Sequence, residues 1–262
     1  MIAPTLLHEI LAEGGLSMLF QPIFDIRSET QSLFAVEALS RGPKGSNGER
    51  ADVLFEYVRR KGKEVEVDRA CTRAALKAAA SLQIECALSI NVHASTLERD
   101  DRWVEYLTEA CEVHALPPRR LILEIVEQQK FWDERRFFHT LDQLRAIGVR
   151  IALDDIGLGY SNHRMLIEIR PELFKIDPYF VIGISAKPHA CAAIESIALL
   201  ADRLGGRVIA EGVESESDLR TLEELGIYLM QGYYLAQPSA SVPALPQSIP
   251  VSSRLVAAVG VG

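Results

Sequence analysis

Short apolar runs, each about as long as a buried strand, recur along the whole chain. Most of them are bounded by turn residues or by helix-start signals, as is typical of strands buried in a core. The pattern predicts strands at residues 17–24, 33–39, 86–92, 121–126, 149–155, 173–177, 207–211 and 227–230.

Helical patterns fill most of the intervals after the second predicted strand. Asp133 stands where it would cap the helix that follows it, and Gly148 stands where a glycine favours the end of that helix. A further helix is expected to start at Ser217 and to end at Gly226. The clearest helical patterns cover residues 64–82, 134–147 and 188–204.

Strands that alternate with helices favour a closed α/β barrel over an open sheet. The first two strands are joined only by DIRSETQS, whereas a parallel crossover needs about a dozen residues or more. We therefore expect a modified (β/α)8 TIM-type barrel with an antiparallel first strand over residues 1–238. Four prolines follow Gln237, so residues 239–262 are expected to form an appendage, either flexible or packed on the barrel.

Charge and composition exclude several classes of partner. The net charge of −8 argues against a DNA-binding protein, which would usually carry a basic stripe. No apolar run approaches the roughly 20 residues of a membrane span, and the N-terminus lacks the basic region of a signal peptide. The four cysteines lie far apart without a CxxC pair, so we expect reduced, mostly buried thiols in a cytoplasmic protein.

Polar residues recur at the C-terminal ends of the predicted strands, which is the face where barrel enzymes carry their active sites. Carboxylates inside apolar strands cost free energy unless they are paired or bind a metal. Oxygen donors that converge on one rim suit one or two hard divalent cations, and two cations would suit phosphoryl chemistry. The residues concerned are Glu37, Asn91, Glu124, Asp154, Asp155, Lys175, Glu211 and Gln231.

Each of these residues taken alone also has a purely structural explanation. The adjacent Asp154 and Asp155 could belong to a simple turn, and Lys175 could form a salt bridge at the barrel rim. Asn91 could bond only to backbone, and Arg41 could be a solvated loop residue. Their occurrence on one rim, in separate elements, favours a functional site.

At these positions the sequence resembles the EAL domain family of cyclic di-GMP phosphodiesterases, over roughly residues 5–238. One tripeptide would carry no weight, but an ordered set of motifs at matching intervals is specific. The set consists of Gln21-Pro22-Ile23, Glu37-Ala38-Leu39 with Arg41, SIN ending at Asn91, LEIVE with Glu124 and Glu127, LDD with Asp154 and Asp155, FKID with Lys175, AEGVE with Glu211 and Glu214, and QGYY with Gln231.

The resemblance implies a bacterial second-messenger enzyme that opens cyclic di-GMP. Water activated at the metal site would attack one phosphodiester bond in line and yield the linear dinucleotide pGpG. Lys175 would contact that water, and Glu211 would act as a metal ligand or as the base. Two Mg²⁺ or Mn²⁺ ions per site are expected, with ligands Glu37, Asn91, Glu124, Asp154 and Asp155, of which Asp155 also counts among the catalytic residues.

The resemblance also assigns residues to the substrate. Arg41 would hold a phosphate, a task that suits its planar fork of donors. Gln21, Leu39 and Gln231 would make further substrate contacts. A homodimer is expected, formed near the loop that follows Asp155, and a regulatory protein partner is an open alternative.

One loop departs from the family pattern. The family usually has DFGTG or DFGSG here, whereas this chain has Asp155-Ile156-Gly157-Leu158-Gly159. Leu158 cannot return a hydroxyl hydrogen bond to Glu127, the residue expected to stabilise this loop. We therefore expect reduced loop order and turnover with competent metal ligands. The alternatives are a cyclic di-GMP receptor with weak or no hydrolysis, and a barrel acting on another phosphodiester.

Overall fold

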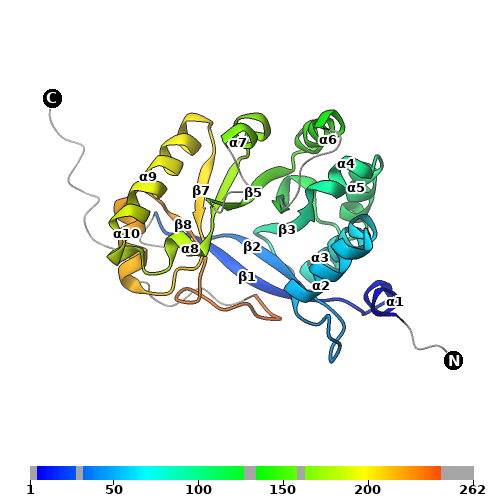
Figure 1. The fold of residues 1–262 in the computed structure, drawn as a ribbon. Coiled ribbons are helices and arrows are strands. Elements are labelled where there is room, and N and C mark those ends of the chain that lie inside the picture. The colour runs from blue at the N-terminus through cyan, green and yellow to red at the C-terminus, as the bar shows by residue number, and fades with distance from the viewer. Residues whose placement is uncertain (1–4, 28–31, 127–133, 158–162, 243–262) are drawn as a thin grey trace.

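The chain folds into a closed barrel of eight strands with helices around its outside (Figure 1). The computed structural model describes residues 5–27, 32–126, 134–157 and 163–242. The strands follow one another around the barrel in chain order. They are β1 (Ser17–Asp25), β2 (Ser32–Arg41), β3 (Ala87–His93), β4 (Leu121–Val126), β5 (Arg150–Ile156), β6 (Leu173–Ile176), β7 (Arg207–Ala210) and β8 (Leu229–Met230).

The first strand runs against its neighbours, as its short connection predicts. β1 pairs antiparallel with β2 and with β8, whereas the pairs from β2 round to β8 are parallel. The register sets Gln21 of β1 opposite Glu37 of β2. The modified TIM-type barrel expected from the sequence is confirmed.

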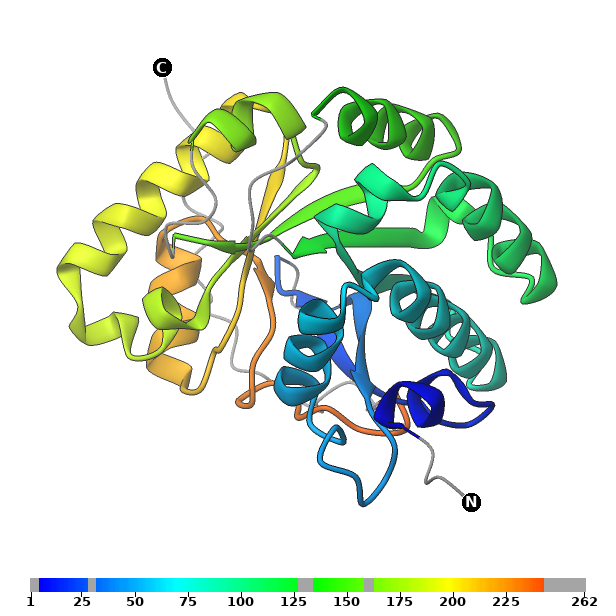
Figure 2. The ribbon, with the colours of Figure 1, turned by 45° about the vertical axis from the view of Figure 1, so that its right-hand side comes forward.

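Helices cover the outer face of the barrel, as the turned view shows (Figure 2). The two longest are α3 and α9, each in an interval where a helix was expected. The helices are α1 (Leu6–Leu11), α2 (Ala51–Lys61), α3 (Glu64–Ser81), α4 (Ala94–Arg99), α5 (Trp103–Val113), α6 (Glu134–Ala146), α7 (His163–Ile169), α8 (Pro178–Val181), α9 (Pro188–Arg203) and α10 (Glu216–Glu224), with 3-10 turns at Pro118–Arg120 and Ile184–Ala186.

The helix ends agree with the sequence in one place and differ in another. Gly148 follows α6 with φ +91°, a conformation that glycine adopts without steric cost. The prediction that Ser217 starts the last helix is wrong by one residue, because α10 begins at Glu216. Ser215 is the cap, because its side chain accepts a hydrogen bond of 3.1 Å from the backbone N–H of Asp218. The predicted cap Asp133 lies outside the described residues.

Inside the barrel, away from the C-terminal ends of the parallel strands, lies a single apolar layer to which every strand contributes. The alternation of side chains along a strand sends one residue in two to the inside. These inward side chains pack into one cluster that closes the barrel below the C-terminal ends of the parallel strands. The cluster comprises Ile23, Ala35, Ala87, Ile122, Ala152, Leu173, Ile209 and Leu229.

A larger core fills the space between the barrel and its helices. It contains the fully buried rings of Trp103 on α5 and Phe137 on α6, packed toward strands β3 to β5. Burying such a side chain stabilises the fold by about 1.5–3 kcal/mol. The four cysteines are free thiols, but only Cys71 and Cys111 are buried, whereas Cys86 and Cys191 are half-buried, so the expectation of mostly buried thiols holds for two of the four. Within the described residues, no helix is both long enough and apolar enough to cross a membrane.

The first residues of the predicted appendage lie against the barrel. Ser239 and Phe20 of β1 exchange backbone hydrogen bonds of 2.7 and 3.0 Å. Val242 packs against the outer core. Residues 243–262 lie outside the described residues, so the predicted division at residue 238 stays a prediction.

Candidate active site

A polar layer lies directly above the apolar layer inside the barrel. Each of its members stands two positions further toward the C-terminal rim than the apolar residue of the same strand, and so points to the same side. One polar residue therefore comes from each strand or from the position just after it. The layer comprises Gln21, Glu37, Ser89, Glu124, Asp154, Lys175, Glu211 and Gln231.

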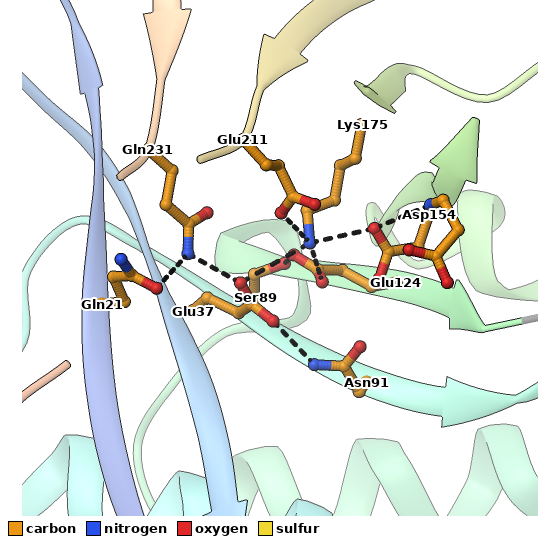
Figure 3. A network of polar contacts seen from close by, with 10 residues as sticks. Gln21, Glu37, Ser89, Asn91, Glu124, Asp154, Lys175, Glu211 and Gln231 are labelled. Atoms are coloured by element: carbon orange, nitrogen blue, oxygen red, sulfur yellow. Dashed lines mark hydrogen bonds and ion pairs between the residues drawn. The ribbon is translucent and has the colours of Figure 1, made fainter. Parts of the chain in front are cut away.

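The ammonium group of Lys175 lies at the centre of this layer (Figure 3). Its side chain is only 1% exposed. Nζ is 2.6 Å from Oε2 of Glu124 and 2.7 Å from Oε1 of Glu211. It also lies 3.3 Å from Asp154 and 3.5 Å from Glu37. Four carboxyl groups from four strands thus surround one positive charge.

Neutral side chains hold the outer sides of these carboxyl groups. Asn91 donates to Oε1 of Glu37 at 2.9 Å, and Gln231 donates to Oε2 of Glu37 at 2.9 Å. Gln231 also donates to Gln21 at 3.0 Å, while its own Oε1 is buried without a partner among the described residues. That oxygen is an acceptor available to a donor group of a ligand.

Ser89 belongs to this network although the analysis of the sequence did not select it. Its hydroxyl is fully buried and donates to Oε1 of Glu124. A serine inside an apolar strand gives a weak signal, because hydroxyls are common in strands and turns. Its position two residues before Asn91, on the same face of β3, is the signal that would have identified it.

Burial and mutual repulsion raise the pKa of some carboxyl groups of this layer, while nearby donors lower the pKa of another. Burial, reinforced by the charge of Glu37, raises the pKa of Glu124 to about 8. Burial also raises the pKa of Glu211 well above its ordinary value, although Lys175 opposes this effect. For Glu37 burial acts in the same direction, but Lys175 and the donors Asn91 and Gln231 outweigh it and lower the pKa.

Lys175 stays protonated in this layer. Burial alone would lower the pKa of its ammonium group, but the surrounding carboxylates of Asp154, Glu124, Glu211 and Glu37 raise the pKa well above the ordinary value. The site therefore combines a permanent positive charge with acidic groups that hold protons unless further positive charge arrives.

Asp155 follows Asp154 in a strained backbone conformation. Its φ is +54°, in the left-handed region that non-glycine residues rarely adopt. Its backbone N–H donates to Oδ1 of Asp154 at 3.0 Å. Burial and the charge of Asp154 raise the pKa of Asp155 to about 6. Ile156 is buried in the outer core, whereas Leu158 and Glu127 lie outside the described residues.

Two cavities open on either side of Glu37, Leu39 and Asp154, which line both of them. One cavity of about 470 Å³ is bounded by β2, β3 and α2 and includes Arg41 and Asn91. The other, of about 400 Å³, is also lined by four further members of the polar layer and by residues of the rim; these are Gln21, Lys175, Glu211 and Gln231, together with Pro178, Ile182 and Tyr233. Every substrate-side residue expected from the sequence therefore lines one or both cavities.

The site offers the oxygen-rich donor set that Mg²⁺ and Mn²⁺ prefer, with more carboxyl groups than positive charge. Within the part of the chain that the structure describes, no three carboxylate, histidine or cysteine side chains are spaced to share one cation. The predicted ligands Glu37, Glu124 and Asp154 converge on Lys175 instead, and Asn91 bonds to Glu37. Their excess of negative charge fits the addition of divalent cations.

A TIM-type barrel with an acidic centre at its C-terminal rim is the class of protein that fold and site define. The profile of the EAL domain matches residues 5–238, and the chain belongs to this family. The cyclic di-GMP phosphodiesterase RocR of Pseudomonas aeruginosa is 36% identical over 151 residues, which cover 58% of this chain and 38% of RocR. An uncharacterized Synechocystis protein is 30% identical over 88% of this chain and 34% of its own length, so the chain spans about a third of the length of these relatives.

Solved structures share the fold. A standalone EAL protein of Vibrio cholerae O395, with cyclic di-GMP bound, matches with a TM-score of 0.79 and 29% identity, covering 88% of this chain and 95% of that one. BlrP1 of Klebsiella pneumoniae, in complex with calcium and cyclic di-GMP, matches with a TM-score of 0.76 and 26% identity over 91% of this chain and 58% of that one. A further BlrP1 complex contains manganese.

Proposed function

We propose that the protein is a metal-dependent phosphodiesterase that hydrolyses cyclic di-GMP to pGpG in bacterial second-messenger signalling. One observation carries the proposal: a buried layer with four carboxyl groups around one ammonium group stands between two cavities. A ligand with two nucleotide halves joined through phosphates would place one half in each cavity and a phosphate over the layer.

Divalent cations would enter where negative charge is in excess. Two Mg²⁺ or Mn²⁺ ions, when bound, lower the pKa of water and neutralise the charge of phosphate oxygens. The residues that would hold them are Glu37, Asn91, Glu124, Asp154 and Asp155. Their arrival would displace the protons that burial keeps on Glu124 and Asp155, whose pKa values are raised to about 8 and about 6.

Lys175 and Glu211 would serve the attacking water. The Nζ of Lys175 carries three donor hydrogens, and one of them can be directed at the water oxygen. With divalent cations bound, Glu211 would lose the proton that burial keeps on it, and its carboxylate would then take the proton that the water releases. The water oxygen then bonds to phosphorus while the P–O3′ bond breaks, and the 3′-oxygen leaves with a proton from solvent. The product carries a 5′-phosphate and a 3′-hydroxyl, as pGpG does.

Arg41 would hold a phosphate next to the layer. Its NH1 donates to the backbone oxygen of Ser40 at 2.9 Å, and no acidic partner for it is found among the described residues. Its charge is therefore available to an anion, and its fork of donors fits two phosphate oxygens. Gln21, Leu39 and Gln231 would contact the rest of the substrate. We further propose a cytoplasmic protein that acts as a homodimer and answers to a regulatory partner.

Single-turnover hydrolysis of cyclic di-GMP with Mg²⁺ or Mn²⁺ tests the proposal, with Glu37→Ala as the matched variant. We expect conversion to pGpG by the wild type, loss of conversion in the variant, and none in EDTA. If the wild type binds the nucleotide with either metal and leaves it intact, the protein is a receptor and the proposal is wrong.

The altered loop is tested separately through Leu158→Thr. We expect the variant to turn over faster than the wild type with the same set of metal ligands. Equal turnover and equal metal affinity in the two proteins would contradict the idea that Leu158 slows the enzyme.

A further inference from the structure

A histidine held by a buried carboxylate borders the larger cavity outside the carboxylate layer. Asp68 of α3 is 1% exposed and accepts hydrogen bonds from the backbone N–H of His93 at 2.9 Å and from Nδ1 of His93 at 2.8 Å. The hydroxyl of Thr96 also donates to Asp68. Three donors converge on this carboxyl group, so it accepts from all of them and fixes the plane of the imidazole ring.

The second ring nitrogen is left for another partner. Because Nδ1 carries the proton that Asp68 accepts, Nε2 is the nitrogen on the opposite side of the ring. No described residue forms a hydrogen bond with Nε2, and Nε2 is not among the buried polar atoms without a partner. His93 lines the larger cavity, and because Nδ1 is bonded to Asp68, Nε2 is the ring nitrogen left for a ligand there.

Phe55 of α2 restrains the same ring from the side. The two ring centres are 5.6 Å apart and the planes meet at 61°, an edge-to-face arrangement that is favourable for aromatic pairs. Phe55 lines the cavity as well. The imidazole is therefore held on two sides before any ligand binds, which lowers the entropy cost of a contact through Nε2.

The surroundings of His93 suit a nucleobase better than a phosphate. Ala51, Phe55 and Val92 supply apolar surface, and Arg59, the cation on this side, is already paired with Glu56. Sites for flat organic groups are mostly apolar with a few well-placed polar atoms. Arg41 lines the same cavity from β2, has no acidic partner among the described residues, and is therefore the cation available to a phosphate.

We propose that His93 is a substrate-contacting, specificity-determining residue that binds the edge of a guanine base through Nε2, with Asp68 as the residue that positions its ring. This inference rests on the proposed function, since it assumes that a guanine nucleotide enters the larger cavity. A purely structural role for His93, tying β3 and the start of α4 to α3, needs only the bonds to Asp68. The substrate-contacting role therefore requires Nε2, whereas the structural role does not.

Two amide variants separate the two roles. His93→Asn keeps a hydrogen-bond donor, its side-chain amide N–H, near the position of Nδ1, so Asp68 can still accept a hydrogen bond. The same change removes Nε2. His93→Gln reaches the position of Nε2. Dissociation constants for cyclic di-GMP and cyclic di-AMP are measured by calorimetry on the full chain, with Ca²⁺ as the cation of one solved complex in this family. Melting temperatures report the fold of each variant.

We expect His93→Asn to weaken cyclic di-GMP binding about three- to tenfold, the value of one hydrogen bond, with a smaller effect on cyclic di-AMP. His93→Gln should recover most of the affinity. Unchanged affinity in His93→Asn, whatever its melting temperature, would overturn the inference, as would equal weakening for both nucleotides. If the wild type itself binds neither nucleotide, the proposed function fails and the inference fails with it.

Discussion

Replacement of Lys175 by methionine tests the electrostatic design of the site. Methionine has a similar volume but no charge, so the change leaves Glu124 and Glu211, now 2.6 and 2.7 Å from Nζ, without their counter-ion. Removing one partner of a buried ion pair costs about 3–5 kcal/mol, because the other charge stays buried and unpaired. Since four carboxyl groups depend on this ammonium, we expect a loss in that range from the free energy of unfolding of the metal-free protein.

The loss should depend on pH in a defined direction. Burial raises the pKa of Glu124 to about 8 and that of Glu211 well above its ordinary value. Below these pKa values Glu124 and Glu211 are neutral, so at pH 6 the variant leaves mainly Glu37, whose pKa is lowered, without its counter-ion. As pH rises through about 8 Glu124 ionises, and its negative charge then lacks the ammonium group as a counter-ion. We therefore expect a smaller loss of unfolding free energy at pH 6 than at pH 9, where it should reach about 3–5 kcal/mol.

Urea unfolding followed by circular dichroism in EDTA, at pH 6 and pH 9, measures both quantities. Lys63→Met is the matched control, because Lys63 pairs with Glu66 at 2.5 Å on the surface, with both side chains more than 40% exposed. Such pairs contribute about 1 kcal/mol or less. If Lys175→Met loses no more than Lys63→Met, or loses the same amount at both pH values, the account of the buried layer is wrong.

Three further perturbations address other parts of the molecule. Arg41→Lys should raise KM for cyclic di-GMP about tenfold with an unchanged melting temperature, because a fork of donors is replaced by one point charge; equal KM values would contradict this. Burial opposes ionisation of Asp25, but hydrogen bonds from Arg27 and Arg207 lower its pKa to about 2. Asp25→Asn should therefore lower the free energy of unfolding, measured by urea titration, by about 2 kcal/mol at pH 7 and by little near pH 2. Trp103→Ala should cost about 3–5 kcal/mol in the same titrations at pH 7, since it empties a fully buried position.

The order of strands and helices could be predicted from local pattern alone. Strand positions were recovered to within about two residues, because apolar runs bounded by turn signals reflect burial directly. The antiparallel pairing of the first two strands followed from the length of their connection, since DIRSETQS is too short for a parallel crossover. The start of α10 was misjudged because Ser215 and Ser217 are equally good caps by residue type, and backbone geometry selects between them.

The candidate residues were also visible in the sequence, because each stands at the end of an apolar strand where a polar group is costly. The ion pairs and hydrogen bonds between these residues could not be predicted from the sequence. Lys175 meets Glu37, Glu124 and Glu211 only because barrel closure brings four strands into register, and no local signal encodes that convergence. The raised pKa of Glu124 follows from the same closure, since it depends on burial and on neighbouring charges.

The pairing of Asp68 with His93 belongs to the tertiary structure in the same way. Twenty-five residues separate the two side chains in the chain, and helix α3 must pack on β3 before they meet. Ser89, on the same strand, acquires its role only through Glu124 on the neighbouring strand. Local propensity and chain length decide where the elements form. The distances between charges, and with them the chemistry, arise only when the barrel closes, because Coulomb and hydrogen-bond energies depend on position in space and not on position in the chain.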